Sequence, residues 1–164
     1  MNLRKILSLA IVIMLAAVFG RELSGQSVER EIRDRVDAWC KAILANDVDE
    51  VKAFYLDSPE TLVIVSSGDV VDGIEDIESM YQEVFEYFEF QQAGFDRVRI
   101  VVDGSSAMAS GRFVSKQVHQ ETGDAYRSVV RTSLFFAKHG DDWMIIGEHS
   151  SAIPGVERVE REEK

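Results

Sequence analysis

The stretch Arg127–Ser151 reads RSVVRTSLFFAKHGDDWMIIGEHSS and contains two predicted strands joined by a short turn. Ala125–Lys138 and Trp143–Ser150 are rich in β-branched and aromatic residues, which favours strands. His139–Asp142 lies between them and carries a Gly-Asp turn signal. A connection this short makes the two strands antiparallel neighbours. The first strand is apolar on both faces, so we expect it in the centre of a sheet.

The strand pattern extends toward the N-terminus. Phe95–Asp103 and Ala107–His119 have the same character and are bounded by turn signals, so the four strands form an antiparallel meander. Further upstream, Thr61–Val65 (TLVIV) is an apolar, β-branched run that predicts another strand.

Two amphipathic helices are predicted before that strand. The first is capped by Ser27 and has Trp39 on its apolar face. Asp47 followed by Glu50 indicates a capping box for a short second helix that runs through Tyr55.

A third helix is predicted to begin at Asp72 or Gly73, and its apolar stripe includes Tyr81 and ends at Phe88. Helices followed by a meander are typical of an α+β fold. We expect a curved, mixed but mostly antiparallel sheet wrapped around the three N-terminal helices, with room for a pocket.

Composition limits the partners. The 164 residues fit one domain, and the net charge of −11 disfavours nucleic acid and anionic membranes as partners. Cys40 is the single cysteine, so the chain forms no internal disulfide, and we expect this thiol in the core.

The two ends differ from the rest of the chain. Residues 1–20 have a basic start and an apolar run, Ile6–Gly20, which predicts a signal peptide cleaved somewhere in 20–26. We therefore expect an exported protein, periplasmic or secreted, without membrane contact after cleavage; the alternative is an uncleaved membrane anchor. Residues 155–164 are expected to form a charged flexible tail.

Several local motifs, in order, resemble one family. They are Asn46-Asp47, Gly73 before the third helix, RTS at Arg131–Ser133, and W-x-I-x-x-x-H-S from Trp143 to Ser150. Over residues 27–154 the chain resembles the nuclear transport factor 2-like superfamily, in particular its SnoaL-like branch. The resemblance implies a cone with a deep pocket. Its members include isomerases, dehydratases, cyclases and subunits that only dimerise.

One departure from the family bears on function. The steroid isomerases of this superfamily carry a base carboxylate on the strand after the second helix, and Thr61–Val65 has no acid. Abstraction of a proton from carbon requires such a base, so the isomerase hypothesis loses weight.

Strict alternation would place His149 on the same strand face as Trp143 and Ile145, toward the interior. His149 is then the candidate catalytic residue or a ligand contact; the alternative is a histidine that bonds to a backbone carbonyl or a serine. Arg131 is expected to anchor a carboxylate or other anion, or to form a structural pair with Glu148 or another acid.

Trp39, Tyr55 and Tyr81 are candidate aromatic walls of the pocket, although each also suits the core. The chain has no H-x-x-x-H, H-x-H or C-x-x-C motif and no glycine-rich phosphate loop, so we expect neither a metal nor a cofactor.

The sequence thus predicts an exported SnoaL-like domain protein that binds a small apolar or amphipathic molecule and pairs as a homodimer through its sheet face. One alternative is a SnoaL-like enzyme with acid–base chemistry at His149. A second alternative is a structural dimerisation module with a filled core.

Overall fold

The computed structural model of the chain describes residues 25–155 and 159–161, so the predicted signal peptide lies outside the described residues. An N-terminal helix occupies residues 25–45. The other elements, in chain order, are α2 (Val48–Lys52), β1 (Leu62–Ile64), β2 (Val70–Asp72), α3 (Ile74–Tyr87), β3 (Phe88–Asp103), β4 (Ser106–His119), β5 (Ala125–His139), β6 (Asp142–Ala152) and β7 (Val159–Arg161).

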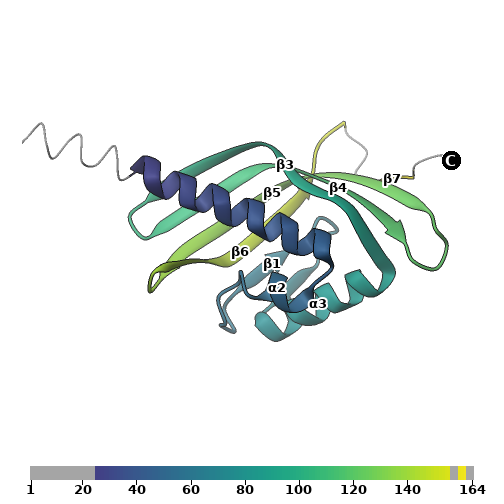
Figure 1. Cartoon of the computed structure of the whole chain (residues 1–164), viewed down its shortest axis with the longest axis horizontal. Coiled ribbons are helices and arrows are strands. Elements are labelled where there is room, and N and C mark those ends of the chain that lie inside the picture. Colours follow the sequence, from purple (N-terminus) through teal and green to yellow (C-terminus); the bar gives the residue numbers. More distant parts are fainter. Residues whose placement is uncertain (1–24, 156–158, 162–164) are drawn as a thin grey trace, which may run out of the picture.

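The strands form one mixed sheet in the order β2-β1-β6-β5-β4-β3, and β7 adds to β5. The β1–β6 pair is parallel and the other pairs are antiparallel. The N-terminal helix lies along one face of the curved sheet, and α3 lies below the end where β3 bends (Figure 1). The predicted α+β fold and the β3–β6 meander are confirmed.

The core fills the space between this helix and the inner face of the sheet. Ile32, Val36 and Trp39 project from the helix and are almost completely buried. They face Leu134 and Phe136 of β5, which are equally buried. Cys40 belongs to the same core, and burial raises the pKa of its thiol to about 12, which makes it inert as a nucleophile.

A β-bulge interrupts β6. Phe135 pairs with Gly147, but the next residue, Phe136, pairs with Ile145, so Ile146 is an extra residue on β6. An extra residue inverts the alternation of side chains along a strand. Trp143 and Ile145 face the core before the bulge, and after it Glu148 takes the inner face and His149 the outer one.

The third helix ends earlier than the sequence predicts. Phe88 has extended backbone angles, begins β3 and pairs with His119, whereas we expected it on the helix and the strand to start at Phe95. The side chain of Asn46 donates to the Phe88 carbonyl at 3.1 Å and accepts from the Phe90 N–H at 3.3 Å. These long-range contacts satisfy the backbone as a strand and override the helical periodicity.

Within the segment expected to form a charged tail, β7 pairs with Tyr126–Ser128 of β5. β5 pairs with β6 from Val130 to His139, and β7 pairs with the part of β5 that precedes Val130.

Candidate functional site

A cavity of about 230 Å³, open to solvent, lies between the helices and the inner face of β4, β5 and β6. Its apolar walls come from Ile43, Val65, Met80, Val84, Phe90, Phe113 and Val130. Its polar lining comes from Trp39, Ser66, Tyr81, Ser115, Gln117, Ser128, Glu148 and Ser150. Among the lining residues of this cavity, Glu148 is the single ionisable carboxyl group, and none is a cation.

Glu148 is held by a hydrogen-bonded pair of tyrosines. The Tyr55 hydroxyl donates to Glu148 Oε2 at 2.6 Å, and the hydroxyls of Tyr55 and Tyr81 are 3.0 Å apart. Burial raises the pKa of the Glu148 carboxyl above its ordinary value, while hydrogen bonds from Tyr55 and Ser150 act in the opposite direction. Burial and the neighbouring carboxylate raise the pKa of both tyrosines, which therefore stay neutral.

Backbone contacts place Tyr55 beside Glu148. Tyr55 forms an isolated bridge with Ile145, where the Leu56 N–H donates to the Ile145 carbonyl at 2.8 Å. The Ile145 N–H donates in turn to the Phe54 carbonyl at 2.8 Å. This pairing lies at the bulge, so the irregularity that turns Glu148 inward also fixes its partner.

The direction of the hydrogen bonds follows from the number of hydrogens. A phenol has one hydroxyl hydrogen, and Tyr55 donates its own to Glu148. The second contact is then a donation from Tyr81 to Tyr55, and the Tyr81 oxygen keeps acceptor capacity. If Glu148 gains a proton, the carboxyl supplies a hydrogen of its own, and both tyrosines can reverse their donation.

Trp39 carries a donor without a partner. Its indole Nε1–H is buried and has no hydrogen-bond partner of normal geometry among the described residues. The Tyr81 oxygen is its nearest acceptor: a hydrogen bond from the indole, outside normal geometry, lowers the pKa of the Tyr81 hydroxyl, although burial outweighs this effect. Trp143 has a second unpartnered indole N–H, but Trp143 does not line the cavity.

Hydroxyl groups cross the sheet side of the cavity. Ser115 and Ser128 are directly opposite each other on β4 and β5. Ser150 on β6 shares a 2.8 Å hydrogen bond with Thr132, and Ser115 donates to Gln117 at 3.0 Å. The sheet side of the cavity is thus polar and the helix side mostly apolar, which suits an amphipathic molecule.

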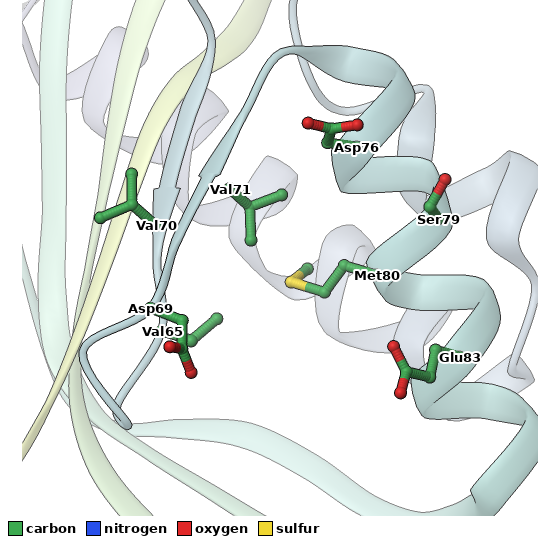
Figure 2. Close-up of a pocket in the computed structure, with 8 residues that line it drawn as sticks. All are labelled: Val65, Asp69, Val70, Val71, Asp76, Ser79, Met80 and Glu83. Carbon is green, nitrogen blue, oxygen red and sulfur yellow. The ribbon is translucent and has the colours of Figure 1, made fainter.

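A groove of about 440 Å³ lies outside the cavity, between the β1–β2 hairpin and α3. Figure 2 shows Asp69, Val70 and Val71 on the hairpin side and Asp76, Ser79, Met80 and Glu83 on the helix side. Val65 and Met80 line both the groove and the cavity, so these two side chains separate them. The groove is larger than the cavity. Its ionisable lining residues are the carboxylates Asp69, Asp76 and Glu83, so no basic side chain stands beside them.

The structure places the predicted site residues in two groups. Trp39 and Tyr81 line the cavity, and Tyr55 lies behind them against Glu148. His149 and Arg131 are exposed on the outer face of the sheet, away from the cavity.

The expected inward orientation of His149 is therefore wrong, because the bulge at Ile146 inverts the alternation. The suggested pairing of Arg131 with Glu148 fails as well, since the two residues lie on opposite faces. Arg131 instead lies opposite Arg112 in the β4–β5 register.

Sequence reasoning missed Glu148 as a site residue. The available signal was a glutamate in an otherwise apolar strand close to the W-x-I motif, but simple alternation assigned it to the opposite face from Trp143. Among the described residues, no cluster of His, Cys, Asp and Glu is arranged to hold a metal ion. No helix in the described part of the chain is long and apolar enough to span a membrane.

Comparison with known proteins agrees with this architecture. The family described as SnoaL-like domain matches residues 32–155. A nuclear transport factor 2-like superfamily protein from Salmonella enterica serovar Typhimurium is 25% identical, with a TM-score of 0.73 over 80% of this chain and 96% of that one. No curated protein sequence matches the chain.

Two further solved structures share the fold. A ketosteroid isomerase-like protein from Erwinia carotovora atroseptica is 17% identical, with a TM-score of 0.66 over 76% of this chain and 95% of that one. A nuclear transport factor 2-like protein of unknown function from Pseudomonas putida is 18% identical, with a TM-score of 0.63 over 78% of this chain and 88% of that one.

The fold and the candidate site define an α+β cone domain with a cavity that is open to solvent. This chain belongs to the SnoaL-like domain family, within the nuclear transport factor 2-like superfamily.

Proposed function

We propose that this protein binds a small, mainly apolar molecule in the cavity and that Glu148 is the principal polar contact. The observation that carries the proposal is a desolvated carboxyl, held by Tyr55, on the wall of a cavity with largely apolar walls. Burying a carboxyl is unfavourable unless its interactions repay the cost. A role toward a ligand explains why this position is not apolar.

Native mass spectrometry of the purified protein, followed by extraction of bound molecules, tests this proposal. A retained small molecule that is lost in Glu148→Gln and kept in His149→Ala is the expected result. His149→Ala is the matched control because it lies one residue away on the outer face. Equal loss in both variants, or a cavity that takes up no apolar probe, contradicts the proposal.

The second candidate function is acid–base catalysis with Glu148 in the role that we first gave to His149. Thr61–Val65 carries no acid, but Val63 pairs directly with Glu148 in the parallel β1–β6 register. Glu148 thus offers a carboxylate from the neighbouring strand, and its raised pKa brings proton exchange closer to neutral pH.

Proton exchange in D₂O tests this second candidate. A ketone that fits the cavity would lose an α-proton to the Glu148 carboxylate and regain a deuteron from it. Deuterium incorporation that is abolished in Glu148→Gln supports catalysis. Binding of the ketone without incorporation leaves the protein a binder.

We also propose that two copies pair through the outer face of the sheet. Val101, Met108 and Phe135 are successive partners across β3, β4 and β5, and Val101 and Phe135 are exposed. An apolar row of this kind on an exposed face is typical of a protein contact surface. Phe135→Glu is expected to convert a dimer to a monomer in sedimentation, and an unchanged dimer excludes this face. A dimer with an empty cavity would favour the structural dimerisation module.

Export is a separate proposal that depends on residues 1–20. Cleavage in 20–26 would release a periplasmic or secreted protein. The intact mass and N-terminal sequence of the protein from its native host decide between cleavage and an uncleaved anchor.

A further inference from the structure

Aromatic side chains form much of the cavity wall around Glu148. Trp39, Tyr81, Phe90 and Phe113 all line the cavity. The ring centroids of Trp39 and Phe113 lie 5.6 Å apart, and the two rings are tilted by 57°. Aromatic rings attract cations to their negative faces, and sites that bind organic ammonium groups are commonly built from such rings. The composition of this wall therefore favours a cation over an anion.

Glu148 has no charged partner in the cavity. It is the one carboxyl group among the lining residues, and no lysine, arginine or histidine lines the cavity with it. Hydrogen bonds from Tyr55 and Ser150 stabilise the carboxylate but leave its charge uncompensated. A carboxylate that is partly removed from water is unfavourable without an opposite charge nearby. A cationic ligand would supply that charge.

The Glu148 carboxyl can be reached by a ligand. Its side chain lies on the inner face of β6 and is only partly buried, and the cavity is open to solvent. Among the described residues, Tyr55 and Ser150 are its two hydrogen-bond donors. A carboxylate has about four lone-pair sites for donors. An ammonium group in the cavity therefore has access to oxygen lone pairs that these residues do not use.

The groove beside the cavity is also acidic. Its ionisable lining residues are Asp69, Asp76 and Glu83, which Figure 2 shows around an apolar floor. Val65 and Met80 line both the groove and the cavity, so the two regions adjoin. Carboxylates along a groove raise the local concentration of a cation and repel an anion. The groove and the cavity thus favour the same sign of charge in a ligand.

We propose that the ligand is an organic cation, in which an apolar skeleton carries a protonated amine that pairs with Glu148 beside the aromatic wall. This inference rests on the proposed function, because it requires that the cavity holds a small molecule. It replaces the anion that Arg131 was expected to anchor.

Three bicyclic probes with the same ring skeleton test the inference. 1-Aminotetralin carries a protonated amine at neutral pH, 1-methyltetralin has a neutral methyl group in its place, and the tetralin-1-carboxylate anion reverses the charge. Dissociation constants are measured by calorimetry on the purified protein. We expect 1-aminotetralin to bind about ten- to hundredfold more tightly than 1-methyltetralin, the contribution of a hydrogen bond to a charged group. The carboxylate should bind more weakly than either.

Glu148→Gln removes the charge and keeps the shape of the side chain. The preference for 1-aminotetralin over 1-methyltetralin should disappear in this variant, while the affinity for 1-methyltetralin changes little. Glu86→Gln is the matched control, because it removes the same charge from an exposed position on α3, outside the cavity and the groove. The preference should persist in this control. Equal loss in both variants would mean that the amine binds to the acidic surface, and the inference would fail.

The pH dependence of the affinity gives a readout in the unmodified protein. Glu148 pairs with a cation only when it is ionised, and burial raises its pKa. The titratable groups nearest to it are Cys40 on the N-terminal helix, Tyr55 after α2 and Tyr81 on α3, whose pKa values are also raised, so they stay neutral.

The affinity for 1-aminotetralin should therefore increase between pH 4 and pH 8, whereas the affinity for 1-methyltetralin stays constant. The increase should be much smaller in Glu148→Gln. An amine affinity that does not change with pH, or a carboxylate probe that binds most tightly, overturns the inference.

The probes also distinguish the ligand class from the binding function. If 1-methyltetralin binds and the amine adds no affinity, the ligand class is wrong and the binding function stands. If none of the three probes binds, both the ligand class and the binding function fail.

Discussion

The Tyr55 hydroxyl donates to Glu148 Oε2 at 2.6 Å, although the two residues are 93 positions apart in the chain. The backbone bridge between Tyr55 and Ile145 positions the tyrosine beside β6. The bulge at Ile146 turns the Glu148 side chain to the inner face of the sheet, toward Tyr55. The relationship joins the segment that follows α2 to the last long strand, β6, and defines the polar centre of the cavity.

Removal of the Tyr55 hydroxyl should destabilise the fold and shift the titration of Glu148. Tyr55→Phe is expected to lower the free energy of unfolding by about 1.5–3 kcal/mol, the contribution of a hydrogen bond to a charged group. The Glu148 pKa should rise, because this hydrogen bond favours the ionised carboxylate. Urea denaturation and ¹³C NMR of labelled glutamate carboxyls measure the two effects. Tyr87→Phe is the control, since Tyr87 is exposed, and equal effects in both variants would argue against the contact.

Glu148 should make stability depend on pH in a direction unusual for a carboxylate. Burial raises the pKa of Glu148 in the folded state above its unfolded value of about 4.3. Its full contribution to the free energy of unfolding is therefore present below the unfolded pKa. That contribution is lost as the pH rises through the folded-state pKa. Glu148→Gln removes this loss, so the variant should gain stability relative to the parent by ~1.4 kcal/mol per unit of pKa shift. Urea unfolding of both proteins across pH 4–8 measures the difference, and a difference independent of pH contradicts the prediction.

Substitution of the two outer-face residues should leave the cavity unaffected. His149→Ala and Arg131→Ala are expected to change the affinity for an apolar cavity probe less than about twofold, because neither side chain lines the cavity. Fluorescence titration measures this affinity. A large loss in either variant would show that the outer face communicates with the site.

Deletion of Ile146 tests the bulge directly. Without the extra residue, regular alternation would turn Glu148 outward and His149 into the interior. We expect loss of cooperative unfolding or of probe binding. Ile146→Ala keeps the extra residue and should retain both, at a cost of about 1 kcal/mol. A deletion variant that still binds the probe would contradict the assigned register.

Met80 should control access between the groove and the cavity, because its flexible side chain lines both. Met80→Ala is expected to speed the association of a neutral probe, and Met80→Phe to slow it. Ser79→Ala is the control, since Ser79 lines the groove but not the cavity. Stopped-flow fluorescence measures the rates, and equal rates in all three variants would place the access route elsewhere.

Local patterns were sufficient for most of the fold. The turn signals and β-branched runs located the four long strands, and Asp47 caps α2 by accepting from the Glu50 N–H at 2.9 Å, as its spacing predicts. The helix-to-strand boundary at Phe88 was wrong because Asn46, 42 residues earlier, fixes the backbone there. Trp39, Tyr55 and Tyr81 were recognised as aromatic candidates, but their hydrogen-bond order was not visible in the sequence.

The sequence by itself determined the order of elements, the faces of the helices and the central position of β5, because these depend on periodicity within short segments. The tertiary structure alone decided which face of β6 meets the cavity. A single extra residue at Ile146 changes the alternation of every residue after it, and its position is set by pairing with β5 and the Tyr55 segment. For that reason Glu148, and not His149, lines the cavity that forms the candidate site.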